Sequence, residues 1–118
     1  MTGMRLLKLM AVAAILTLLV LMLGPFGGLE RSTGVSDKIG HIIAFAVIAG
    51  SLAILRPRWN LPVIACAAFA VGVGVEIIQG LTGRDADVAD VFADMAGIAL
   101  ATFVLMSGMA MRFRARIP

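Results

Sequence analysis

The carboxylates of this sequence are concentrated in one short stretch, whose residue types suit acid–base or ligand-binding chemistry. The chain has seven acidic residues. Five of them fall in VEIIQGLTGRDADVADVFAD, residues 75–94: Glu76, Asp85, Asp87, Asp90 and Asp94. The flanks of this stretch are almost purely apolar. A charge at mid-bilayer costs about 2.5–3.5 kcal/mol, so ionisable groups in such surroundings are candidates for function.

Helical spacing predicts which polar groups share a face, because residues three and four apart are neighbours on a helix. Three such faces are Asp37, His41 and Phe45; Gly72, Glu76 and Gln79; and Asp87, Asp90, Asp94 and Gly97. At a rise of 1.5 Å per residue, Glu76 lies about 7–8 Å and Asp94 about 10 Å inside their predicted helices. We expect both to face the bundle interior, with Arg84, Lys38, His41 or each other as partners.

These groups could act in two ways. Arg84, Lys38 and His41 would hold a phosphate or glycan oxygen, since Arg offers a bidentate fork. Glu76, Asp90 or Asp94 would supply acid–base groups or bind a divalent cation through oxygen ligands. The predicted catalytic set is Glu76, Asp90, Asp94 and His41, and the predicted ligand-binding set is Arg84, Lys38, Asp37 and Gln79. No cofactor is predicted, and the question of a metal stays open.

A structural role is the alternative for several of the same residues. Asp37 and Asp87 would cap helix N-termini, where the helix dipole favours an anion. Glu76 and Gln79 would join helices by hydrogen bonds, and Asp85 would be a solvated loop residue.

The composition is that of a membrane protein. Of 118 residues, 61% are hydrophobic and 14% charged, with a mean hydropathy of +1.05, whereas soluble domains are nearer half apolar and a quarter charged. The length suits one domain. Nucleic acid is not an expected partner, because a basic face with interleaved aromatics is missing. Cys66 is the only cysteine, which excludes an intrachain disulfide.

Four apolar segments are long enough to be spanning helices, each needing about 20 residues. They cover about residues 9–26, 37–55, 61–81 and 87–111. The first imitates a signal peptide, but GPFGG follows it in place of an A-x-A-like site, so we expect a retained helix. Ser36 or Asp37 is the predicted N-cap of the second, and Trp59 suits the membrane interface. Short connections predict an all-α antiparallel four-helix bundle.

The basic residues orient this bundle with both termini in the cytoplasm. The cytoplasmic side would carry seven of the ten: Arg5, Lys8, Arg56, Arg58, Arg112, Arg114 and Arg116. The opposite side would carry Arg31, Lys38 and Arg84. The seven acids, which include Glu30, all fall near the outer ends of the spans. The sequence thus predicts one polar, outward-facing end. Small residues predict close helix packing or self-association: Ala93, Gly97 and Ala101, and the pair Ala70 and Gly74.

Two motifs in this order resemble those of the VanZ-like membrane proteins. DKIGHIIAF, residues 37–45, is similar to the family's D-K-x-x-H-x-x-x-F, and the stretch from Val75 to Gly97 resembles its second motif. The matching positions are Asp37, Lys38, His41, Phe45, Glu76, Gln79, Arg84, Asp90, Asp94 and Gly97. Asp94 departs from the family, which commonly has Asn there. The resemblance covers about residues 36–105 and implies a single VanZ-like domain over residues 1–118.

The resemblance implies a multi-pass protein of the bacterial inner membrane, and the family's founding member is associated with low-level teicoplanin resistance. Two functions compete. In the first, the outer polar end binds or acts on the head group of an envelope lipid or a lipid-linked precursor. In the second, the chain is a non-catalytic scaffold whose polar cluster is structural. A transporter is disfavoured, since no inverted repeat is visible. Whether a reaction is catalysed stays open.

Overall fold

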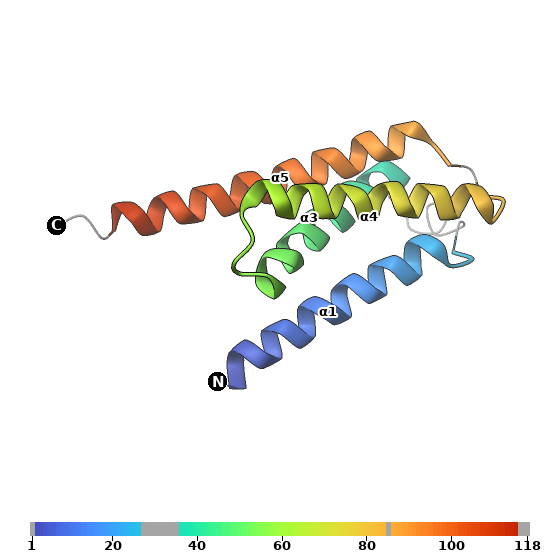
Figure 1. Ribbon diagram of the computed structural model, residues 1–118. Coiled ribbons are helices and arrows are strands. Elements are labelled where there is room, and N and C mark those ends of the chain that lie inside the picture. The colour runs from blue at the N-terminus through green and yellow to red at the C-terminus, as the bar shows by residue number, and fades with distance from the viewer. Residues whose placement is uncertain (1, 27–35, 85, 116–118) are drawn as a thin grey trace.

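The protein is built from four long helices, seen in a computed structural model that describes residues 2–26, 36–84 and 86–115 (Figure 1). The helices are α1 (Thr2–Leu23), α3 (Asp37–Leu55), α4 (Leu61–Leu81) and α5 (Val88–Arg114). All four are long and apolar enough to cross a membrane. The described residues contain no strand. The predicted all-α fold with four membrane-spanning helices is confirmed. Glu30, Arg31, Asp85 and Arg116 lie outside the described residues.

The helix bounds follow the prediction closely for α3 and α4 and less closely for the outer two helices. Helix α1 starts at Thr2 rather than Leu9, because Arg5 and Lys8 are good helix formers and extend the apolar run without a break. Helix α5 starts at Val88 and continues to Arg114. The predicted limits followed hydropathy alone, and the basic first turns of α1 and last turn of α5 lie beyond the apolar runs.

Side-chain caps fix where α3 and α4 begin. Ser36 Oγ accepts a hydrogen bond from the Ile39 amide at 3.3 Å, which makes Ser36 the N-cap of α3. Asn60 Oδ1 accepts one from the Val63 amide at 3.0 Å and caps α4, with Pro62 in its first turn. Such caps satisfy amides that have no partner inside the helix.

A tight turn connects α4 to α5 and brings the polar ends of both helices together. Gly83 adopts a φ of +76°, a left-handed conformation that glycine adopts without steric cost. The Arg84 amide donates to the Gln79 carbonyl at 3.0 Å, which closes the end of α4. Asp87 Oδ1 then accepts from the Ala89 amide at 2.8 Å at the start of α5. This bond is the capping role expected of Asp87.

Helix α3 is the centre of the bundle and packs against the other three helices. Phe45 and Ile48 on this helix have no exposed surface. The starts of α3 and α5 and the ends of α1 and α4 lie at one end of the molecule (Figure 1). Helix α1 is the most peripheral, with Ala11 as its one buried described residue. The topology therefore brings the polar ends of α3, α4 and α5 to one end of the bundle, beside the end of α1.

Close packing between α3 and α5 depends on a glycine. A Cβ at Gly97 would overlap the Ile42 carbonyl oxygen and come within 2.9 Å of the Ala46 amide nitrogen. Its neighbours Ala93 and Ala101 are also buried, so the predicted small-residue series forms this contact. Small residues are the common device for helix packing in lipid.

The pair predicted on α4 does not form such a contact with any other described residue. Ala70 is exposed, and a Cβ at Gly74 would meet no atom within 4 Å. Gly72 is the close-packed glycine of α4 instead, because a Cβ there would lie 2.7 Å from Asp94 Oδ2. The sequence offers small residues on several faces of α4, and only the packing against α3 and α5 selects one.

Candidate functional site

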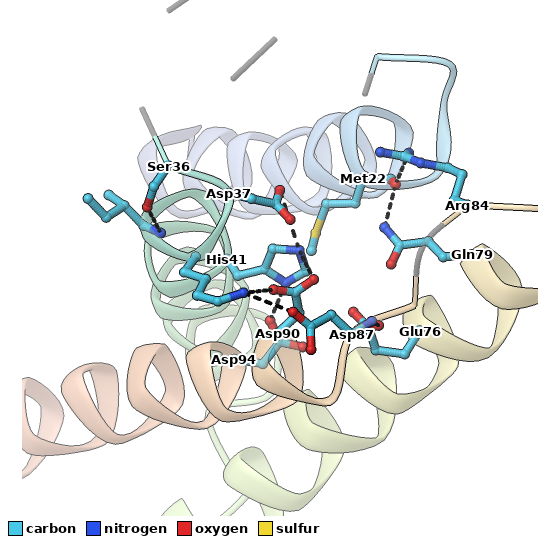
Figure 2. Close-up of polar contacts among 12 residues, drawn as sticks. Met22, Ser36, Asp37, His41, Glu76, Gln79, Arg84, Asp87, Asp90 and Asp94 are labelled. Carbon is cyan, nitrogen blue, oxygen red and sulfur yellow. Dashed lines mark hydrogen bonds and ion pairs between the residues drawn. The ribbon is translucent and has the colours of Figure 1, made fainter. Parts of the chain in front are cut away.

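Five polar side chains from three helices meet at the polar end of the bundle (Figure 2). Helix α3 contributes Asp37 and His41, α4 contributes Glu76, and α5 contributes Asp90 and Asp94. We call this group the polar cluster. His41, Glu76, Asp90 and Asp94 are buried, whereas the Asp37 side chain is 50% exposed. The cluster is therefore a mostly enclosed site with one side near solvent.

His41 and Asp94 form the innermost contact of the polar cluster. His41 Nδ1 lies 2.7 Å from Asp94 Oδ1, and Asp94 has no exposed surface. The His41 ring also stacks on Phe45, with ring centroids 6.5 Å apart and planes inclined by 14°. A carboxylate at this distance accepts the Nδ1 hydrogen and fixes the orientation of the ring. The predicted partnership between Asp94 and His41 is present.

The other ring nitrogen of His41 points toward two carboxylates without bonding to either. Nε2 lies 3.9 Å from Asp90 Oδ2 and 4.0 Å from Asp37 Oδ1. Both distances exceed the 2.7–3.2 Å range of hydrogen bonds to nitrogen. The imidazole thus lies between the buried carboxylate of Asp94 on one side and the more widely spaced carboxylates of Asp37 and Asp90 on the other.

Lys38 closes the rim of the cluster by bridging two acids of α5 and its preceding turn. Its Nζ lies 3.2 Å from Asp90 Oδ1 and 3.1 Å from Asp87 Oδ2. Lys38 and Asp87 are both about half exposed, so this part of the site is solvated. The Ala89 amide, and then the Lys38 ammonium, lower the pKa of the Asp87 carboxyl below its usual value.

Two buried carboxylate oxygens have no hydrogen-bond partner among the described residues. Glu76 Oε2 accepts from the Asp87 amide at 3.2 Å, but Glu76 Oε1 and Asp94 Oδ2 accept from none. An unpaired buried charge is costly. These oxygens therefore call for a proton or a cation inside the cluster.

Arg84 and Gln79 lie apart from the polar cluster and hold the end of α1 instead (Figure 2). Arg84 Nη1 donates to the carbonyls of Met22 at 2.6 Å and Gly24 at 2.8 Å, and Gln79 Nε2 donates to Met22 at 2.9 Å. No ion pair links Arg84 to any carboxylate in the parts of the chain described. The expected pairing of Arg84 with Glu76 or Asp94 is therefore absent from these parts of the chain.

The physical reason lies in the helix end. The last carbonyls of a helix have no partner within it and carry partial negative charge, so they compete with carboxylates for a guanidinium. Sequence reasoning missed the Met22 and Gly24 carbonyls because every residue has one. The Gly24-Pro25 stop was the available signal, since it marks where α1 must expose them.

Two groups within the cluster place potential metal ligands close together. The donor atoms of Asp37, His41 and Asp90 lie within 4.8 Å of one another, as do those of His41, Glu76 and Asp94. Mixed nitrogen and oxygen donors at this spacing suit a divalent metal ion. Between α4 and α5 there is also an apolar groove of about 550 Å³, lined by residues that include Cys66, Phe69 and Met95, and none of the cluster side chains.

Comparison with known proteins identifies the family of this chain. The family model VanZ/LLP1 matches residues 5–111. The chain belongs to the VanZ/LLP1 family. No curated protein and no solved structure gives a significant match. The match extends over all four helices, further than the motif-bearing residues 36–105 that the resemblance covered. The chain is thus a VanZ-like multi-pass membrane protein.

Proposed function

We propose that this VanZ-like protein binds, and acts on, the polar head group of an envelope lipid or lipid-linked precursor at the membrane face formed by the polar cluster. One observation carries the proposal. His41 is buried, oriented by Asp94 at 2.7 Å on Nδ1, and turned with Nε2 toward the half-exposed Asp37. An imidazole held by a carboxylate on one nitrogen and open on the other is the usual arrangement of a general acid or base.

We assign a different role to each residue of the cluster. His41 would exchange a proton with a hydroxyl or phosphate oxygen of the head group, while Asp94 acts as a positioning residue. Lys38 at the rim offers an ammonium for a phosphate or glycan oxygen. Asp90, Asp37 and Glu76 would supply further acid–base or ligand groups. Arg84 Nη1 and Gln79 Nε2 are bonded to the end of α1, so we assign these two residues to holding that helix end.

Membrane position supports a lipid rather than a water-soluble ligand. The cluster lies at the end of a bundle whose helices expose apolar side chains along their length, so a lipid head group reaches it without leaving the bilayer. By the positive-inside rule, the charge bias described above favours an orientation in which this end faces the outer side of a bacterial inner membrane. A contribution to glycopeptide resistance would follow from altering such an envelope lipid.

Native mass spectrometry of the purified protein in mild detergent tests this function. We expect wild type to retain one lipid class, and His41→Gln to bind it at least about tenfold more weakly, as expected for loss of one hydrogen bond to a charged head-group oxygen. Arg84→Lys is the control, since it keeps a donor for the α1 carbonyls and leaves the cluster intact. Equal lipid retention in wild type and His41→Gln would contradict the proposal.

A scaffold remains the second candidate because several polar contacts join helices directly. Lys38 connects the start of α3 to Asp87 and Asp90, and Arg84 connects the α4–α5 turn to α1. If the cluster only stabilises the bundle, His41→Gln lowers the melting temperature without changing which lipids are retained. The same mass spectra, recorded beside thermal melts, separate the two functions.

A further inference from the structure

Three donor atoms on the accessible side of the cluster surround a space instead of bonding one another. His41 Nε2 is 3.9 Å from Asp90 Oδ2 and 4.0 Å from Asp37 Oδ1, and all three atoms lie within 4.8 Å of one another. When Nδ1 donates its hydrogen to Asp94, the neutral ring carries its lone pair on Nε2. Three electron-rich atoms then face one another, an arrangement that repels unless a proton or a cation lies between them.

The spacing suits one small divalent ion. Metal–nitrogen and metal–oxygen bonds of about 2.0–2.2 Å put two ligands of a tetrahedral ion about 3.4 Å apart. Each carboxylate would therefore move inward by about 0.5 Å, which the half-exposed Asp37 side chain permits. We propose that His41 Nε2, Asp37 and Asp90 bind a divalent transition-metal ion at the rim of the polar cluster.

Each buried ligand is oriented by a contact to its other polar atom, as metal ligands in proteins usually are. Asp94 fixes His41 through Nδ1 at 2.7 Å, and Lys38 holds Asp90 through its other oxygen, Oδ1, at 3.2 Å. A histidine that binds metal through one nitrogen commonly donates the other N–H to a carboxylate, which orients the ring and raises its basicity. These contacts do not involve His41 Nε2 or Asp90 Oδ2, the two atoms that face the space.

The charges of the region provide an independent reason for a cation. The cluster and its rim bring together five carboxylates: Asp37, Glu76, Asp87, Asp90 and Asp94. In the part of the chain described, Lys38 is the one lysine that pairs with any of them. Glu76 Oε1 and Asp94 Oδ2 are buried and unpartnered. A divalent ion next to them offsets this excess negative charge more effectively than a single ammonium.

The donor types select the class of ion. An imidazole with two carboxylates suits Mn²⁺, Fe²⁺ or Zn²⁺, whereas Mg²⁺ and Ca²⁺ favour oxygen ligands throughout. Three protein ligands leave positions open for a head-group oxygen. Because Nε2 cannot bind the ion and exchange a proton at once, His41 is a ligand in the metal-bound protein and the acid–base role falls to Glu76. The open position for a head-group oxygen rests on the proposed function, whereas metal binding itself needs no lipid.

Titration of the full-length protein in detergent with Mn²⁺ alone tests the site. The protein is first treated with a chelator, and free Mn²⁺ is then followed by electron paramagnetic resonance. We expect saturable binding of one ion per chain, with a nitrogen hyperfine coupling that disappears in His41→Gln. Absence of saturable binding by wild type, or of nitrogen coupling to the bound ion, would overturn the proposal.

Two matched variants separate a ligand from general charge. Asp37 and Asp87 have side chains that are 50% and 53% exposed, and Asn at either position removes one negative charge. We expect Asp37→Asn to weaken Mn²⁺ binding by about tenfold or more, and Asp87→Asn by about threefold at most, since Asp87 faces Lys38 instead of Nε2. Equal weakening by the two would show charge attraction only and refute the site.

A third variant tests the position of the ion. Glu76→Gln should reduce affinity less than Asp37→Asn does, and the opposite order would refute the assignment by moving the ion to the deeper group of His41, Glu76 and Asp94. Lipid mass spectra of the same variants keep the two proposals distinct. A wild-type protein that retains its lipid but does not bind Mn²⁺ contradicts the metal site alone, and one that binds Mn²⁺ but retains no lipid class contradicts the head-group function alone.

Discussion

At the scale of single residues, Asp94 decides how His41 is presented. Its Oδ1 bonds His41 Nδ1 at 2.7 Å, while Oδ2 lies unpartnered in the space left by Gly72. The family commonly has Asn at this position, and an Asn side chain keeps the acceptor oxygen while replacing the unpartnered oxygen with an amide. The orientation of His41 therefore needs an acceptor at position 94, and the negative charge is a separate feature of this chain.

This division leads to a prediction about stability. Asp94→Asn should change the free energy of unfolding by less than about 1 kcal/mol, because the bond to His41 Nδ1 survives. Asp94→Ala should lower it by about 2–3 kcal/mol, since His41 loses its partner and a buried cavity opens. Chemical or thermal unfolding in detergent measures both. Equal losses in the two variants would show that the charge, rather than the acceptor, stabilises the pair.

At the scale of helices, the contact between α3 and α5 aligns the cluster. His41 comes from α3 and its carboxylate partners Asp90 and Asp94 from α5, so their distances depend on how closely the two helices approach. Gly97 sets that approach, one turn below Asp94. Both helices also begin at the cluster, so the positive ends of their helix dipoles lie beside it. Helix packing and helix direction thus both serve the site.

Substitution of Gly97 should therefore disturb the bundle more than substitution of another glycine on α5. Gly97→Ala would push a methyl group into the Ile42 carbonyl, and we expect a loss of about 1–3 kcal/mol in unfolding free energy. Gly108→Ala is the control, because a Cβ there meets no atom within 4 Å. Its expected effect is neutral, or stabilising by about 0.5 kcal/mol, from reduced backbone entropy in the unfolded chain.

Thermal melts of the two variants in the same detergent provide the comparison. A Gly108→Ala protein that melts as early as Gly97→Ala would contradict the α3–α5 contact.

At the scale of the whole molecule, the polar cluster and most of the basic residues lie at opposite ends. The polar cluster lies where α3 and α5 begin, and the described basic residues Arg5, Lys8, Arg56, Arg58, Arg112 and Arg114 lie at or near the other end, by the direction of their helices (Figure 1). The longest dimension of the bundle is 57 Å, well above the roughly 30 Å of a bilayer's hydrocarbon core. Each end can therefore reach its own membrane surface.

The positive-inside rule then predicts the topology, with both termini cytoplasmic and the α4–α5 turn outside. Single cysteines at Thr82→Cys and Arg114→Cys, in a Cys66→Ser background, test it with a membrane-impermeant thiol reagent. We expect position 82 to react in intact cells and position 114 to react only after permeabilisation. Labelling of position 114 from outside would indicate the reverse orientation, with the cluster on the cytoplasmic face.

The sequence by itself determined the four helices and the faces on which their polar residues lie. Apolar length predicted the spans, a cap at Ser36 or Asp37 predicted the start of α3, and three- and four-residue spacing put Asp37 beside His41 and Asp90 beside Asp94. These features depend on the chain near each residue, so local periodicity is enough to predict them.

Only the tertiary structure decided which faces meet and at what distance. It paired His41 Nδ1 with Asp94, turned Nε2 toward Asp37 and Asp90, and gave Arg84 to the carbonyls at the end of α1. These outcomes depend on the depth and rotation of one helix against another. Backbone carbonyls and small residues occur along every helix, so the sequence contains many equivalent partners, and packing alone selects among them.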